Sequence, residues 1–125
     1  MRRNVSYREI GGPGGLLARL EEFTGNSMHA VGDVDRDGYS VYSYETEIAR
    51  VVRDPETGSF VAFHAETNRW SVTTARHLSL VRSWLPGTLR PLHSPRTGGG
   101  LSLPERFTSD IRNRREKRIR ELLAR

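Results

Sequence analysis

The chain has 125 residues, 35% of them apolar, and this length supports one small domain with a small hydrophobic core. The absence of cysteine excludes disulfides, thiolate metal sites and cysteine nucleophiles, and it agrees with a reducing cytoplasm, where we expect the protein. The formal net charge is +5, and residues 108–125 alone contribute +4, so the excess charge is concentrated in one terminal segment.

The first fifteen residues, 1–15, are predicted to form a flexible N-terminal segment, because they end in the run GGPGG. The start of this segment has the positive charge of a signal peptide, but no apolar run follows it. Apolar side chains then recur at helical spacing until Gly25, which predicts a short helix over about residues 15–24. No apolar stretch approaches the roughly 18 residues that a membrane span needs.

A small antiparallel β-meander of four to five strands is predicted next. Residues 28–31 form its first strand, and the turn at 33–38 ends in Asp-Gly, a strong hairpin signal. The stretch 39–52 is either one long strand with a bulge near Glu45 or two strands.

The later part of the meander has equally clear turn signals. Pro55 and Gly58 suit a chain reversal at 54–58, which leads into a strand at 59–65. A second turn at 66–69 leads into a last predicted strand at 70–73.

A helix follows the meander, with Thr74 as its predicted N-cap. Its apolar stripe is formed by Leu78, Val81, Trp84 and Leu85, and Pro86-Gly87 ends it. We expect this stripe to cover one face of the sheet, because a small meander cannot bury itself alone.

The remaining residues comprise a Pro/Gly-rich segment, 86–104, and a basic C-terminal helix, 105–125, with Thr108 or Ser109 as its predicted cap. The predicted fold is therefore α+β: a small α+β domain at 16–85, a linker and the basic helix.

Two short blocks resemble a known group of proteins. Tyr42–Ala49 reads YSYETEIA and Trp70–His77 reads WSVTTARH. They are similar to the SYxTxIA strand and the YSVTTxxH strand-to-helix corner of small uncharacterised proteins encoded by phages and mobile elements of actinobacteria. Trp70 stands where that pattern usually has Tyr. The resemblance covers about residues 40–85 and implies a phage or prophage origin and a β-meander with a helix, but no reaction.

The basic helix is the main candidate site. Its guanidinium and ammonium groups suit phosphates, and nucleic-acid binding is predicted through Arg112, Arg114, Arg115, Lys117, Arg118 and Arg120. An alternative is docking onto a protein partner, or homodimerisation, through the thin apolar seam of Ile111, Ile119, Leu122 and Leu123. A third option is a solvated helix that packs on its own domain. The narrow seam argues against a membrane surface.

A second candidate is the corner at residues 73–77, where a helix N-terminus suits an anion and Arg76 and His77 would add donors. Ordinary capping by Thr74, with Arg76 in solvent and His77 satisfied by a backbone group, is the commoner arrangement, and we favour it.

Three other motifs are weaker indications of a binding site. Asp33–Gly38 fits the opening of a calcium loop, but Tyr44 occupies the position of the bidentate Glu, so a hairpin turn is expected. The GGPGG run lacks the Gly-Lys-Ser/Thr of a phosphate-binding loop, and the four histidines have no paired metal spacing.

Strand aromatics beside Arg50, Arg53 and Arg69 suit stacking of single-stranded bases, but we expect most of them to build the core. They are Tyr39, Tyr42, Tyr44, Phe60, Phe63 and Trp70.

No catalytic signature is recognisable, and no cofactor or metal is expected. The sequence therefore predicts a non-enzymatic accessory protein that binds DNA or RNA without sequence preference; the alternative is a phage-encoded modulator of a host protein.

Overall fold

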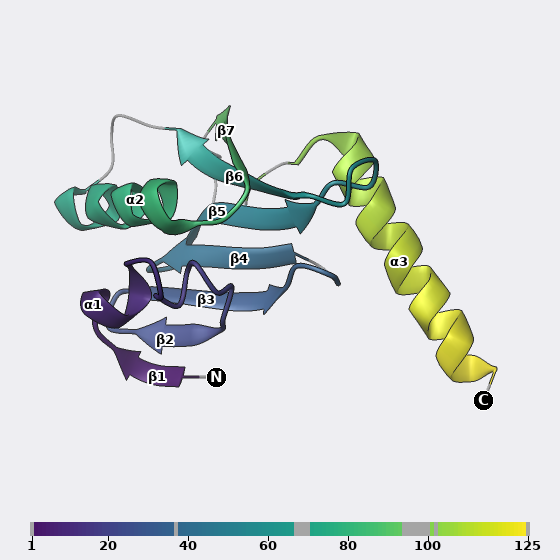
Figure 1. The fold of residues 1–125 in the computed structure, drawn as a ribbon, viewed down its shortest axis with the longest axis horizontal. Helices are drawn as coiled ribbons and strands as arrows, with labels where there is room; N and C mark the ends of the chain where they lie inside the picture. Colours follow the sequence, from purple (N-terminus) through teal and green to yellow (C-terminus); the bar gives the residue numbers. More distant parts are fainter. Residues whose placement is uncertain (1, 37, 67–70, 94–100, 102, 125) are drawn as a thin grey trace.

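The computed structural model describes residues 2–36, 38–66, 71–93, 101 and 103–124, which form an α+β fold (Figure 1). The strands are β1 (Arg2–Val5), β2 (Phe23–Gly25), β3 (Met28–Asp33), β4 (Gly38–Ser43), β5 (Thr46–Arg53), β6 (Phe60–Glu66) and β7 (Thr88–His93). The helices are α1 (Tyr7–Ile10), α2 (Val72–Trp84) and α3 (Glu105–Leu123). The predicted fold class is confirmed.

Within these residues one sheet has seven strands in the order of the sequence, so the predicted number of four to five is too low. β2 to β6 pair antiparallel, whereas the outermost strands β1 and β7 pair parallel with their neighbours. These edge strands come from the predicted flexible segment 1–15 and the predicted linker 86–104. β7 contains Pro91, which an outermost strand tolerates because proline has no N–H to pair.

The predicted hairpins at 33–38 and 54–58 are confirmed. β4 and β5 are two strands joined at Tyr44, whose φ is 54°, and Ser43 lies opposite Thr46. The register shifts between Val41 and Tyr42, which pair with Ala49 and Glu47, so a bulge does occur, but its extra residue is Ile48 of β5 and not Glu45. At the next reversal the Gly58 amide donates to the Asp54 carbonyl at 2.8 Å.

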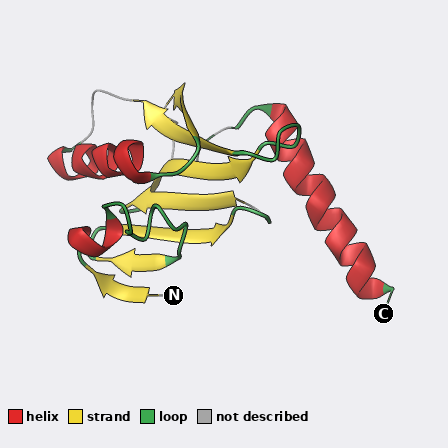
Figure 2. Cartoon of the chain, viewed as in Figure 1, coloured by secondary structure: helices red, strands yellow, loops and turns green. Residues whose placement is uncertain are grey.

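The main core lies on one face of the sheet and is covered by α2 and by the segment that follows α1 (Figure 2). Leu78 and Val81 of α2 are buried there, as the apolar stripe predicts. On the sheet, Ala30, Val41 and Ala49 are adjacent in the register and fully buried.

The helix predicted over 15–24 is wrong. This stretch consists of turns up to residue 20, and β2 begins at Phe23. Leu16 and Leu17 are fully buried, so their spacing reflects burial and not helix formation. Leu20 has a φ of 53°, a left-handed conformation that a helix cannot contain.

The predicted strand at 70–73 is also wrong in its described part, because Val72 already belongs to α2. Ser71, and not Thr74, is the N-cap: its hydroxyl accepts the Thr74 amide at 3.2 Å. Trp70 and the predicted turn at 67–69 lie outside the described residues.

A second, smaller core lies on the opposite face, beneath the start of α3. Val61 and Phe63 of β6 pack there against Leu103 and Phe107. The predicted cap of α3 at Thr108 or Ser109 is wrong, because the helix begins at Glu105 with Pro104 as its N-cap. Part of the predicted linker is therefore core structure, and it fixes where the basic helix begins.

Candidate nucleic-acid interface

The first turn of α3 is attached to the sheet by one aromatic side chain. Phe107 is 1% exposed, and its ring meets the Phe63 ring edge-on at 5.1 Å between centroids, with a 76° angle between the planes. Edge-to-face aromatic pairs are favourable because a positive ring edge meets a negative ring face. Phe107 therefore anchors α3 on its own domain.

A buried polar contact reinforces this attachment. The Glu47 carboxylate accepts a hydrogen bond from the Leu101 amide at 2.6 Å. It also accepts hydrogen bonds from Nε and Nη2 of Arg50, at 2.8 and 2.6 Å. The Glu47 side chain is fully buried, and Arg50 supplies the bidentate partner that a buried carboxylate needs. The chain is thus held at Leu101, immediately before α3.

Beyond this anchor, most of α3 is exposed, and in Figure 1 the helix leads away from the body of the sheet. Of the predicted phosphate-binding residues, Arg114 is half-buried, and the exposed ones are Arg112, Arg115, Lys117, Arg118 and Arg120. Arg114 and Arg115 interact with other groups of the chain. Ion pairs of the described residues outside α3 include Arg19 with Glu21, Arg50 with Glu47 and Arg53 with Asp35.

The basic side of α3 faces the connection between β3 and β4 across a groove of about 700 Å³. The groove is lined by Asp35, Arg36, Arg114, Arg115, Lys117, Arg118, Glu121 and Leu122. Five cationic side chains outnumber two carboxylates there, so the groove favours an anion. Arg36 is a lining residue that the sequence did not single out, because only the folded hairpin brings it beside α3.

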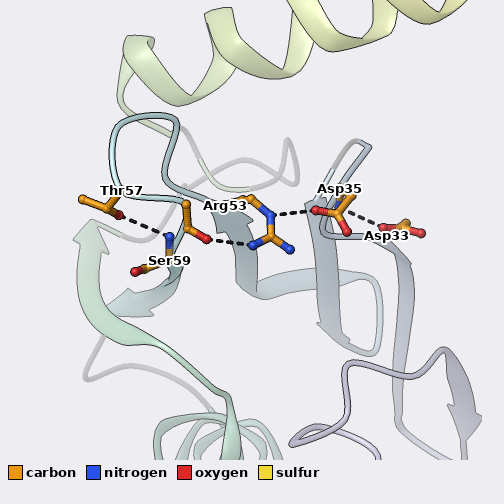
Figure 3. Close-up of polar contacts among 6 residues, drawn as sticks. Asp33, Asp35, Arg53, Thr57 and Ser59 are labelled. Atoms are coloured by element: carbon orange, nitrogen blue, oxygen red, sulfur yellow. Dashed lines mark hydrogen bonds and ion pairs between the residues drawn. The ribbon is translucent and has the colours of Figure 1, made fainter.

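The β3–β4 connection is held in place by Arg53 (Figure 3). Arg53 donates from Nε to Asp35 Oδ1 and from Nη1 to the Gly58 carbonyl, both at 2.7 Å. Asp33 Oδ1 accepts the Asp35 amide at 2.8 Å, as in an ordinary Asx turn. An arginine thus occupies one carboxylate of the calcium-like motif, and no group of three metal-ligating side chains occurs among the described residues. Asp37 lies outside them.

The apolar seam of α3 is partly open to solvent. Ile119, Leu122 and Leu123 are 49%, 56% and 79% exposed. The side chain of Ile111 lies outside the described residues. The alternative surface for a protein partner is therefore present at the end of the helix.

The strand-to-helix corner has a different character. His77 is fully buried: its Nε2 lies 2.8 Å from Tyr7 Oη and 3.2 Å from Ser27 Oγ, and its Nδ1 lies 2.6 Å from Ser43 Oγ. Burial, followed by the nearby Arg76 charge, lowers the pKa of His77 from its ordinary value. Both ring nitrogens are engaged, so His77 does not belong to the candidate interface.

Arg76 is exposed, and its guanidinium lies 5.4 Å from the centre of the Tyr7 ring. The corner agrees with the structural alternative in that Arg76 is exposed, but Ser71 and not Thr74 is the cap, and hydroxyls and not a backbone group satisfy His77. These hydroxyls come from segments far apart in the chain, and no local pattern indicates them.

The geometry defines a small α+β protein with a mostly antiparallel sheet and an exposed basic helix. The model of a family of unknown function, DUF8033, matches residues 16–84, and the chain belongs to this family. The match includes the β3–β4 connection and α2 but not α3. Searches of curated proteins and of solved structures returned no match. In the described part of the chain, no helix has the length and apolar character of a membrane span.

Proposed function

We propose that this protein is a non-enzymatic accessory protein that binds nucleic acid without strong sequence preference. The groove between α3 and the β3–β4 connection supports this proposal, because its five cations exceed its two carboxylates. Phosphate contacts of this kind carry no sequence information, and they release condensed counterions. We further propose a phage or prophage origin, on the resemblance of residues 40–85, and action in the host cytoplasm.

The residues that contact phosphates in this proposal are the exposed cations of α3. Lys117 and Arg118 line the groove, and Arg112 and Arg120 extend the charged surface along the helix. Arg50, near the start of the helix, already pairs with Glu47 and is therefore not counted among the phosphate contacts. A polyanion therefore meets its highest density of accessible positive charge on α3.

A salt titration tests the proposal. Fluorescence anisotropy is recorded with a labelled oligonucleotide, and the logarithm of the binding constant is plotted against the logarithm of salt concentration. Replacing Lys117 and Arg118 by Gln is expected to weaken binding and to reduce the magnitude of the slope by about 1.5, because each lost phosphate contact contributes about 0.7–0.9.

The matched control replaces Arg8 and Arg82, two exposed arginines of α1 and α2, by Gln. It changes the net charge equally but leaves α3 intact, so binding should remain close to wild type. Binding that does not depend on salt, or an equal loss in both double variants, would contradict the proposal.

The alternative is docking of a host protein, or of a second copy, onto the seam of Ile119, Leu122 and Leu123. Their exposure is the observation that favours it. Replacing Leu122 and Leu123 by Ala separates the two functions: nucleic-acid binding should persist if phosphates are the target. A wild-type dimer that this variant dissociates, together with unmeasurable nucleic-acid binding, would favour the alternative.

A further inference from the structure

A strip of polar and aromatic side chains crosses the face of the sheet opposite α2. The register aligns Arg3, Thr24, His29, Tyr42 and Glu47 in one row across β1 to β5. These residues alternate with the buried side chains of the main core, so they lie on the other face of the sheet. Among the described residues, the smaller core covers this face around β5, β6 and β7.

Two rings in this row form a parallel stack. His29 and Tyr42 have their ring centroids 4.8 Å apart and their planes within 3° of each other. Both side chains are half-buried, in contrast to Tyr39 and Phe63, which are core residues at 0% and 1% exposure. The sequence could not separate these two groups of strand aromatics, and the structure leaves one stacked pair accessible on the sheet surface.

Charged side chains lie in the same row as the stack and in the adjacent row. Arg3 is exposed in the same row, and the adjacent row contains Arg50 and the exposed Arg90. Glu47 and Arg50 form a pair on this face and add no net charge. The carboxylates near the end of β3 include Asp33 and Glu22, whose Oε2 accepts a hydrogen bond from the Gly32 amide at 2.9 Å. The strip therefore offers planar groups for stacking, and the cations of α3 supply the contacts for phosphates.

The strip is connected to the basic groove through the same two strands. β3 ends at Asp33 and β4 begins at Gly38, and the connection between them lines the groove. His29 is four residues from that end of β3, a path of about 13 Å at ~3.3 Å per residue. A single flexible strand can reach both surfaces at once.

We propose that this strip is a stacking platform for unpaired nucleobases, and that the ligand of the protein is single-stranded nucleic acid. The inference rests on the proposed function and specifies its substrate class. In a duplex the bases are already paired and stacked, whereas in a single strand they can extend the His29–Tyr42 stack. The groove beside α3 then binds phosphates, and the platform supplies the preference for single strands.

The test compares two labelled probes of equal length, an oligothymidine single strand and a mixed-sequence duplex, at the same salt concentration. We expect wild type to prefer the single strand. Tyr42→Leu keeps an apolar side chain but removes the ring, so affinity for the single strand should fall roughly ten-fold while duplex affinity and the salt slope stay unchanged. Tyr42→Phe should retain the preference, because it keeps the ring.

His29→Leu removes the other ring and gives a second reading if Tyr42→Leu folds poorly. The matched control is Tyr44→Leu, which removes an exposed ring that lies beside His77 and outside the strip. Equal wild-type affinity for both probes, or unchanged single-strand affinity in both Tyr42→Leu and His29→Leu, would refute the stacking platform but not the proposed phosphate binding by α3. If wild type binds neither probe, the proposed function and the platform fall together.

Discussion

The buried carboxylate of Glu47 gives the sharpest test of how the start of α3 is attached. Glu47→Gln preserves the shape of the side chain but removes its charge and replaces one acceptor oxygen by an NH₂ donor. Three donors now converge on the carboxylate, two from Arg50 and one from the Leu101 amide. The glutamine side chain can accept hydrogen bonds from only some of these three donors, and its NH₂ group would face the Arg50 guanidinium.

The cost follows from the burial of these groups. An unsatisfied buried amide costs about 1–3 kcal/mol, and hydrogen bonds to charged groups contribute about 1.5–3 kcal/mol each. The Arg50 side chain is 23% exposed, so water recovers part of its loss, whereas Glu47 is fully buried. We therefore expect Glu47→Gln to lower the free energy of unfolding by about 3 kcal/mol, close to the range for breaking a buried pair.

Urea unfolding followed by circular dichroism measures this change, and a thermal scan should show a midpoint lower by about 10 °C. Glu45→Gln is the matched control, because Glu45 is an exposed glutamate in the same hairpin, and its loss should cost less than ~0.5 kcal/mol. Equal stability of the two variants would refute the claim that Glu47 is a buried, fully used acceptor.

Three further predictions concern other parts of the fold. Because the pKa of His77 is lowered in the folded state, the His77 ring of the unfolded chain binds a proton at a higher pH than that of the folded chain. The free energy of unfolding should therefore fall by up to about 1.4 kcal/mol per pH unit below pH ~6.5. Urea midpoints of His77→Gln should lack this part of the pH dependence. Phe107→Ala should cost about 3–5 kcal/mol in the smaller core, and hydrogen exchange should rise in α3 before α2; equal acceleration in both would contradict separate cores. Gly32→Ala places a Cβ against the Gly38 carbonyl at a φ of 107° and should lower the free energy of unfolding by at least ~2 kcal/mol. Gly12→Ala, at a φ of 95° but with nothing within 4 Å of the new Cβ, should lower it by about 1 kcal/mol; urea unfolding measures both.

The parts of the fold that the sequence predicted are those governed by local signals. The Asp-Gly sequence at the start of β4 and the Pro55 to Gly58 reversal specify hairpins within a few residues, and the stripe of Leu78 and Val81 identifies a helix by its period. Such patterns describe neighbours in the chain. They are therefore readable without knowing the tertiary structure.

The parts that were mispredicted depend on contacts between distant segments. Residues 2–5 and 88–93 become edge strands only because β2 and β6 offer them free backbone groups, and neither segment has an alternating pattern. Leu16 and Leu17 have helical spacing but are buried in a turn, so tertiary burial overrode the local period.

The same distinction holds for the candidate site. The cations of α3 are visible in the sequence as a cluster, whereas Arg36 joins them only across a folded groove. His77 lay in a plausible anion-binding corner, yet hydroxyls of Tyr7, Ser27 and Ser43 enclose it. Charge composition is a local property, and the accessibility of a side chain is not.

The proline in β7 has a consequence for the behaviour of this protein at high density. Molecules that occupy adjacent positions on one polymer bring their outermost strands close together, and an unpaired strand is a template for intermolecular pairing. Pro91 interrupts the row of donors on that strand, so the β7 edge is a poor starting point for aggregation. In the proposed complex with nucleic acid, neighbouring copies would therefore lie along the ligand with less risk of pairing their sheets.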